Sequence, residues 1–166
     1  MQRVQAALDA HELPGASLCL ELTESLLMND PAAAADLLDN LRSLKVRLSI
    51  DDFGTGYSSL SHLRRFPVDH VKIDQSFVEN LDRDDTSEES LIAAIVAMAR
   101  ALRVTTVAEG VETRGQADRL HALGCDFAQG YLYAHPVSPA QIPEVARRLG
   151  LARHPHLTVL SDREFA

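Results

Sequence analysis

Short runs rich in leucine, valine and isoleucine alternate along the chain with longer stretches whose apolar residues recur at helical spacing. The short runs predict five strands, at residues 17–23, 46–51, 70–74, 104–109 and 126–133. The longer stretches predict helices at residues 31–44, 58–65, 88–102, 114–123 and 139–149. Residues 1–15 predict a short helix followed by a Pro-Gly turn.

The predicted helices carry start and stop signals as well as an apolar stripe. Asp30 precedes Pro31, so an N-cap residue is followed by proline at the first helical position. Three further starts have the spacing of a capping box: Thr86 with Glu89, Thr113 with Gln116, and Ser138 with Gln141. Gly124 and Gly150 stand where a helix is expected to end in a left-handed residue.

The regular alternation of strand and helix predicts parallel strands joined by right-handed crossovers. Two architectures have this pattern, a (β/α)₈ barrel and a five-stranded doubly wound sheet. A complete barrel usually needs about 200 residues or more. Because the chain has 166 residues, length alone favours the open, doubly wound sheet.

The composition is that of one soluble domain with a substantial core, since 46% of the residues are hydrophobic and 24% are charged. The formal net charge of −8 argues against binding to a nucleic-acid backbone, so no DNA partner is expected. No apolar stretch is long enough to span a membrane, no secretory signal pattern precedes the first helix, and the two cysteines lack metal-ligand spacing. These features predict a cytoplasmic protein without a membrane segment.

Successive side chains of a strand point to opposite faces of the sheet. In the second predicted strand, Val46, Leu48 and Ile50 therefore share an apolar face, and Asp51 lies on the other face. The first and third strands repeat this pattern, so each offers an ionisable group near its carboxyl end. The polar residues at the five strand ends are Glu21, Asp51, Asp74, Glu109 and Gln129. Folds with parallel strands build their sites at this edge of the sheet.

A cluster of carboxylates would repel itself unless cations neutralise it. A single charged strand end is more often solvated, but several in register favour a site. Hard oxygen ligands suit Mg²⁺ or Mn²⁺, and the adjacent pair Asp51 and Asp52 could bridge two such ions. Two ions a few ångströms apart support in-line hydrolysis of a phosphodiester. Lys72, among these carboxylates, would orient the attacking water or contact a phosphate.

Five sequence blocks at these positions resemble the EAL-domain family of cyclic-di-GMP phosphodiesterases. They are ELTES at 21–25, DDFGTGYSSL at 51–60, VKID at 71–74, VAEGVET at 107–113 and QGY at 129–131. The blocks occur in order over roughly residues 10–150, and the ten-residue block that begins at Asp51 is the most specific. The resemblance implies a (β/α)₈ barrel, which overturns the preference that length alone favours.

The resemblance also implies roles for the matching positions. Glu21, Asp51, Asp52 and Glu109 resemble the metal ligands of the family, which would hold two divalent ions, Mg²⁺ or Mn²⁺. Lys72 matches the lysine near the hydrolytic water. Glu109 is also the expected general base, so that Lys72 and Glu109 are the expected catalytic residues.

Four further positions match supporting or substrate-side residues of the family. Gln129 matches the glutamine that completes the inner shell of the site. Glu24 resembles the glutamate that anchors the loop after the Asp-Asp pair. Asp74 and Glu112 match supporting or substrate-side positions. The substrate implied by the resemblance is cyclic-di-GMP, opened to the linear dinucleotide pGpG.

The sequence also departs from the family pattern. The Glu-Ala-Leu segment and the Asn-x-Ser strand end, which supply further ligands, are absent. We therefore expect a truncated barrel with about five of eight strands, formed by residues 1–150 and followed by a polar tail at 151–166. The open edges of such a sheet favour a homodimer or pairing with a missing N-terminal barrel half.

Three functions remain open at this point. The first is a metal-dependent phosphodiesterase acting on cyclic-di-GMP. The second is a degenerate module that binds cyclic-di-GMP or a protein partner without turnover, and the third is a non-functional fragment of a longer reading frame. A phosphoacceptor domain is disfavoured, because its acid pair is expected on the first strand and its lysine on the last.

Overall fold

The computed structural model describes residues 2–55, 66–82 and 87–150. Its five strands are parallel and form one sheet in the order β1-β2-β3-β4-β5. They are β1 (Cys19–Thr23), β2 (Arg47–Phe53), β3 (His70–Ile73), β4 (Thr105–Ala108) and β5 (Phe127–Ala128). Each strand pairs with its neighbour in the sequence, and the five predicted strands are all present.

The α-helices are α1 (Gln2–Ala10), α2 (Glu24–Asn29), α3 (Pro31–Ser43), α5 (Gln75–Val78), α6 (Ser87–Leu102), α7 (Arg114–Leu123) and α8 (Ile142–Arg148). Two 3₁₀ turns, η1 (Gly15–Ser17) and η2 (Pro139–Gln141), precede β1 and α8. The helix predicted at residues 58–65 lies outside the described residues. The sequence pattern does not predict α2 and α5, because each is a short segment that directly follows a strand. None of the helices in the described residues has the length and apolar composition needed to span a bilayer.

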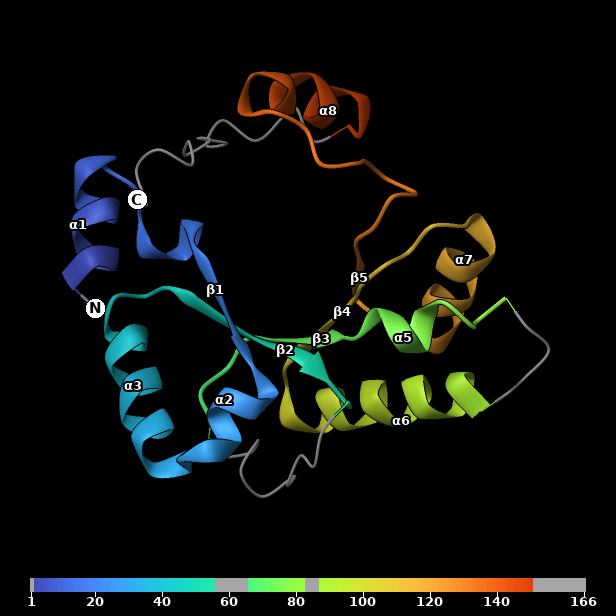
Figure 1. Ribbon diagram of the computed structural model, residues 1–166, viewed down its shortest axis with the longest axis horizontal. Coiled ribbons are helices and arrows are strands. Elements are labelled where there is room, and N and C mark those ends of the chain that lie inside the picture. Colours follow the sequence, from blue (N-terminus) through green and yellow to red (C-terminus); the bar gives the residue numbers. More distant parts are fainter. Residues whose placement is uncertain (1, 56–65, 83–86, 151–166) are drawn as a thin grey trace.

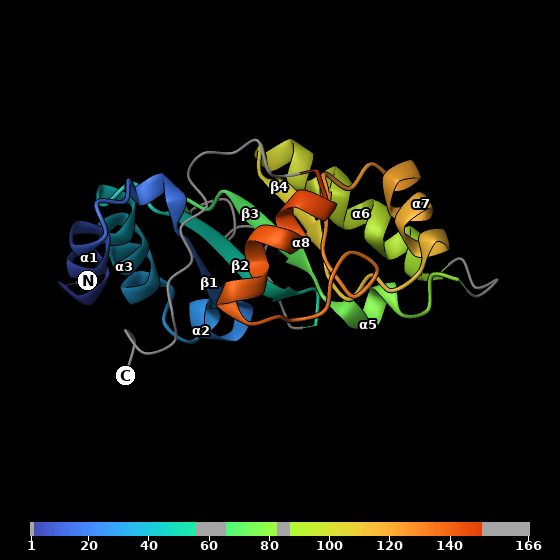
Figure 2. The same ribbon diagram turned by 90° about the horizontal axis from the view of Figure 1, so that it is seen from above.

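The two architectures that the sequence leaves open differ in strand order. A doubly wound sheet reverses its order at a switch point, whereas this sheet runs consecutively from β1 to β5. Figure 1 shows α3, α6 and α7 along the outer side of the curved sheet, with α8 apart from them, and Figure 2 shows the same layers from above. The sheet is therefore an arc of the barrel type, and the length-based preference for a doubly wound sheet is wrong. The reason is connectivity, because every crossover adds the next strand on the same side.

The core lies between the outer face of the sheet and the helices. Leu48 and Ile50 of β2 and Val71 and Ile73 of β3 are almost completely buried, as the alternation of side chains predicts. The helices complete this layer with the buried residues Leu38, Leu41, Ile92, Val96 and Leu120. Burial of large aliphatic side chains contributes about 1.5–3 kcal/mol each, so this layer holds the arc together.

Most of the helix boundaries follow the signals in the sequence. The carboxylate of Asp30 accepts hydrogen bonds of 3.1 Å from the backbone N–H groups two and three positions later. Thr113 and Gln116 form the predicted capping box at the start of α7. Gly124 ends this helix with a left-handed φ of 83°. The box predicted at Thr86 lies outside the described residues.

The fifth strand is much shorter than predicted, since it contains only Phe127 and Ala128 rather than residues 126–133. At Gly130 the backbone of the next turn passes so close to Val111 that a Cβ atom would lie 2.3 Å from the Val111 N and O atoms. The backbone N–H of Tyr133 then bonds to the Gly130 carbonyl, which closes a turn. The chain thus leaves the sheet directly after the second residue of β5.

Candidate active site

Lys72 is the centre of an ion cluster at the carboxyl edge of the sheet. Its Nζ lies 2.7 Å from Glu21 Oε2, 2.8 Å from Asp51 Oδ1 and 2.8 Å from Glu109 Oε1. The four residues come from β1, β2, β3 and the position directly after β4. The sheet therefore brings together four of the sequence-predicted site residues, because neighbouring parallel strands end at the same edge.

The Lys72 side chain is buried, with 5% of the residue exposed. Burial by itself lowers the pKa of a lysine, but hydrogen bonds to Asp51, Glu109 and Glu21 outweigh it and raise the pKa of Lys72 above its ordinary value. The ammonium group therefore stays charged at physiological pH. Lys72 can donate hydrogen bonds and supply positive charge, but it cannot accept a proton.

Glu109 has the opposite character within the same cluster. Burial raises the pKa of Glu109, and the charges of Asp51 and Glu21 add to this increase, so that Lys72 offsets only part of it. Gln129, which follows β5, donates a 2.6 Å hydrogen bond from Nε2 to Glu109 Oε1. An orientated carboxylate with increased proton affinity is suited to accept a proton or to bind a cation.

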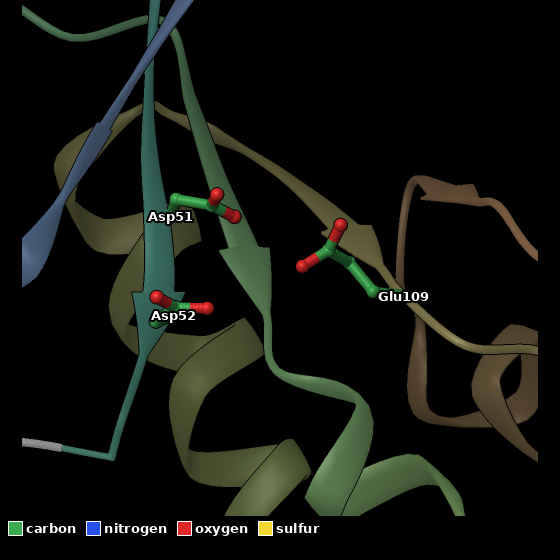
Figure 3. A group of neighbouring side chains, drawn as sticks. All are labelled: Asp51, Asp52 and Glu109. Atoms are coloured by element: carbon green, nitrogen blue, oxygen red, sulfur yellow. The ribbon is translucent and has the colours of Figure 1, made fainter.

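Asp51 and Asp52 are consecutive, and in a regular strand their side chains would point to opposite faces. The register between β2 and β3 shifts between Ile50 and Phe53, which is the irregularity of a β-bulge. Asp52 also has a left-handed φ of 55°, which is uncommon for a residue other than glycine. Figure 3 shows the result: the Asp51 and Asp52 carboxylates lie on the same side and face Glu109.

The carboxylates of Asp51, Asp52 and Glu109 form a group in which one oxygen of each lies within 4.8 Å of the others. Three hard oxygen donors at this spacing fit Mg²⁺, Mn²⁺ or Ca²⁺, which prefer carboxylate ligands. Asp51 and Glu109 also contact Lys72, so the metal-type group and the ion cluster share two residues. Glu21 belongs only to the ion cluster, and about half of its side chain is exposed.

Glu24 lies at the start of α2 and is buried, with 4% of the residue exposed. Its Oε2 accepts a 3.2 Å hydrogen bond from the backbone N–H of Gly54, two residues after Asp52. Gly54 has a φ of 97°, a conformation that favours glycine. A carboxylate bond to the backbone of the Asp51-Asp52 loop is the contact that an anchoring residue would make.

Asp74 and Glu112 lie at the border of the site without joining the ion cluster. Asp74 caps α5, since its Oδ1 accepts hydrogen bonds from the backbone N–H and the hydroxyl of Ser76. It thus stands at the N-cap of a helix rather than at the end of a strand. Glu112 lies in the loop that begins at Glu109, after β4, and ends before α7.

A cavity of about 610 Å³ opens beside the carboxylates. It is lined by Asp52, Asp74, Gln75, Glu109, Gly110, Glu112, Gln129, Gly130, Tyr131, Ala134, His135 and Pro136. Sequence reasoning did not select Tyr131 and His135, whose ring centroids lie 4.3 Å apart. The position of Tyr131 in the QGY block was a usable signal, whereas no sequence pattern indicated His135.

A consecutive parallel sheet with acidic groups and a buried lysine at its carboxyl edge defines an α/β-barrel protein with a metal-type site. Comparison with known families makes this class specific. The sequence model of the EAL domain family matches residues 1–136. The chain therefore belongs to the EAL domain family.

Curated relatives agree with this assignment. The chain is 42% identical over 162 residues to the cyclic di-GMP phosphodiesterase NbdA of Pseudomonas aeruginosa, a match that covers 98% of this chain and 21% of the relative. The chain spans about a fifth of the length of the first curated relatives it matches, between 18% and 21%.

Solved EAL structures share the fold. The MucR phosphodiesterase of Pseudomonas aeruginosa, in complex with cyclic-di-GMP, has a TM-score of 0.79 and 43% identity over 83% of this chain and 56% of that chain. BlrP1 of Klebsiella pneumoniae, in a complex with manganese and cyclic-di-GMP, has a TM-score of 0.74 and 33% identity over 80% of this chain and 34% of that chain. BlrP1 has also been solved with calcium and cyclic-di-GMP. The present chain covers part of these TIM-type barrels.

Proposed function

We propose that the chain carries the catalytic edge of a divalent-metal-dependent phosphodiesterase that opens cyclic-di-GMP to linear pGpG. One observation carries the proposal: one oxygen from each of the Asp51, Asp52 and Glu109 carboxylates lies within 4.8 Å of the others, beside the Lys72 ammonium group. Family membership supplies the substrate, since relatives in this family are cyclic-di-GMP phosphodiesterases.

Glu21, Asp51, Asp52 and Glu109 are the proposed ligands of two ions, Mg²⁺ or Mn²⁺. The bound ions would supply Lewis-acid polarisation of the phosphate and a water of lowered pKa. Manganese in a solved relative supports a divalent ion at this edge. The bulge at Asp52 supports the assignment. An uncommon, energetically costly backbone conformation there places two consecutive carboxylates on the same side of the strand.

Lys72 and Glu109 are the proposed catalytic residues. Lys72 donates hydrogen bonds to the attacking water or to a phosphate oxygen, where its fixed charge stabilises the developing negative charge. Glu109 accepts the proton of the water as the new P–O bond forms. The bond from phosphorus to the ribose oxygen breaks, and this oxygen takes a proton from solvent to become the free hydroxyl of linear pGpG. Gln129 keeps the Glu109 carboxylate orientated through its 2.6 Å hydrogen bond.

The remaining residues act through position. Asp74 and Glu112 border the cavity and are proposed on the substrate side. Glu24 is the proposed anchor of the loop that carries Asp52, through its bond to Gly54.

A cytoplasmic location is part of the proposal, because the substrate is an intracellular second messenger. In the described part of the chain β1 pairs with β2 alone, and its other edge supports association with a second chain.

The direct test is hydrolysis by the purified chain. The chain is incubated with cyclic-di-GMP and Mn²⁺ or Mg²⁺, and the nucleotides are separated by chromatography. We expect linear pGpG that requires the metal and disappears in Asp52→Asn. Absence of product at high protein concentration, under conditions where NbdA is active, would exclude hydrolysis by this chain.

The second candidate function is binding of cyclic-di-GMP without turnover. It is favoured by the ion cluster itself, because Lys72 contacts three carboxylates and offsets part of their charge, so the cluster can persist as a binding surface. Calorimetry with cyclic-di-GMP would then give a saturable binding curve while chromatography detects no product. No heat of binding and no product together would remove both functions.

A further inference from the structure

Gln116 is a buried polar residue of α7 whose side chain bonds to two separate segments, the loop before α7 and the end of α5. Its Oε1 accepts hydrogen bonds from the backbone N–H groups of Glu112 and Thr113, at 2.8 and 3.0 Å. Its Nε2 donates a 3.2 Å hydrogen bond to the carbonyl of Val78, the last residue of α5. Only 5% of Gln116 is exposed, so water cannot readily replace these bonds.

The chemistry of these contacts requires a carboxamide. The side chain must accept from two N–H groups and donate to one carbonyl, and both functions must lie at the end of a two-methylene chain. Glutamate at neutral pH accepts but does not donate, and methionine fills the volume with neither function. The capping box predicted from the sequence explains only the bonds within the α7 start, and the bond to Val78 goes beyond it.

The loop of residues 109–113 is tied to α5 at both of its ends. Near its start, Gly110 lies so close to α5 that a Cβ atom there would be 2.6 Å from Gln75 Cβ. At its end, Gln116 connects Glu112 to Val78. Between these points Val111 is completely buried.

This arrangement affects the two glutamates of the loop differently. The backbone N–H of Glu109 bonds to the carbonyl of Ile73 at 3.1 Å, and its side chain is held by Lys72 and Gln129. The backbone N–H of Glu112 bonds instead to Gln116. Glu109 therefore keeps its place without Gln116, whereas Glu112 depends on it.

We propose that Gln116 is a positioning residue that holds Glu112, on the substrate side of the cavity, in register with α5. This inference rests on the proposed function, since it assigns Glu112 to the binding of cyclic-di-GMP. It predicts that loss of Gln116 weakens nucleotide binding much more than binding of the metal to Asp51, Asp52 and Glu109.

The test compares Gln116→Met with Arg119→Gln as a matched control. Arg119 lies on the same helix and pairs with Glu89 of α6 at 2.9 Å, away from the cavity. Calorimetry measures cyclic-di-GMP affinity in the presence of Ca²⁺ and, separately, Mn²⁺ affinity without nucleotide. A hydrogen bond to a charged group contributes about tenfold or more, so we expect cyclic-di-GMP affinity to fall at least about tenfold in Gln116→Met, where Glu112 is no longer held in place. Mn²⁺ affinity should change less than about threefold, and Arg119→Gln should change neither.

Amide hydrogen exchange gives a readout that does not depend on nucleotide binding. The amides of Glu112 and Thr113 should exchange faster in Gln116→Met than in Arg119→Gln at equal global stability. If Gln116→Met folds poorly, Gln116→Glu is used for the affinity comparison alone, because it removes the donor to Val78 and keeps the acceptor for the Glu112 and Thr113 amides.

The outcomes separate the inference from the proposed function. Equal losses of Mn²⁺ and nucleotide affinity, or unchanged exchange at Glu112 and Thr113, would overturn the positioning role of Gln116. If the wild-type chain binds no cyclic-di-GMP, the proposed function fails, and the exchange comparison still decides whether Gln116 holds the loop.

Discussion

The two edges of the sheet use acidic side chains in opposite ways. At the amino edge, Asp69 Oδ2 accepts a 2.9 Å hydrogen bond from the backbone N–H of Leu48 on β2. Asp126 Oδ2 accepts bonds from the backbone N–H and the hydroxyl of Thr106 on β4, at 2.8 and 2.9 Å. These carboxylates accept hydrogen bonds from backbone N–H groups at the starts of β2 and β4 and thereby stabilise the sheet.

At the carboxyl edge the acids face each other and one ammonium group. Glu21, Asp51 and Glu109 share Lys72, and Asp52 faces the same space. Within residues 2–55, 66–82 and 87–150, no backbone N–H bonds to these four carboxylates, whereas Glu24, outside the cluster, bonds to the N–H of Gly54. The comparison shows that an acid bonded to backbone stabilises the fold, whereas an acid bonded to a cation remains available for chemistry.

The largest effect is expected from Asp52→Asn at the carboxyl edge. The substitution keeps the shape of the side chain and removes one charge from the proposed metal ligands. Mn²⁺ affinity and hydrolysis should both fall by more than about 100-fold, since even outer-shell changes cost about 10- to 100-fold. Thermal stability without metal should stay the same or rise, because like charges repel. Calorimetry measures Mn²⁺ affinity and chromatography measures hydrolysis. A lower melting temperature with intact Mn²⁺ binding would mean that Asp52 stabilises the fold, as the acids of the amino edge do, and does not bind the metal.

A smaller effect is expected from Lys72→Met, which removes the cation and leaves three carboxylates facing each other. Breaking a fully buried pair costs about 3–5 kcal/mol, and partial exposure of the carboxylates reduces this to about 2 kcal/mol. Urea unfolding at neutral pH with a chelator measures the loss. Added Mn²⁺ should restore part of the stability, and the absence of any loss would show that the cluster is effectively solvated.

At the amino edge, Asp126→Ala should lower stability without affecting the metal. Thr106 is completely buried, so its backbone N–H and hydroxyl would lose their partner at a cost of about 1–2 kcal/mol. The same urea unfolding measures the cost. Mn²⁺ affinity should equal that of the wild type, and a fall in affinity would mean that the two edges are coupled.

The smallest effect concerns the pH dependence of stability in the metal-free chain. Because the pKa of Glu109 is raised above 4.5 in the folded chain, its protonated form stabilises the fold. This contribution is complete below about pH 4.5 and is lost as the pH rises through the folded pKa. The Glu109→Gln variant has no carboxyl group to titrate and therefore does not lose this contribution. Its free energy of unfolding, relative to that of the wild type, should increase from pH 4 to pH 7. A difference that does not change over this interval, measured by urea unfolding with a chelator, would contradict the raised pKa.

Much of the fold could be predicted from the sequence because its local signals agree with each other. Alternation within strands identified the buried faces at Leu48 and Ile50, and the caps at Asp30 and Thr113 located two helix starts. Strand order could not be read from local pattern or from length. It required the family motifs, since a barrel and a doubly wound sheet have the same alternation of elements.

Part of the candidate site could likewise be predicted from the sequence, and part could not. Alternation alone indicates that Glu21, Asp51 and Glu109 share an edge with Lys72, and the structure brings all four together. By the same rule Asp52 should point away. Its orientation depends on the bulge in β2, which forms only when β2 pairs with β3.

By itself, the sequence determined the parallel arrangement, the apolar faces and the acidic character of one edge, because each depends on residues close together in the chain. Only the tertiary structure decided that Asp69 and Asp126 bond to backbone and that Glu21, Asp51 and Glu109 face Lys72. It also decided that Gln116 reaches Val78, 38 positions earlier in the chain. Such contacts depend on the distance between segments in space, which no local pattern encodes.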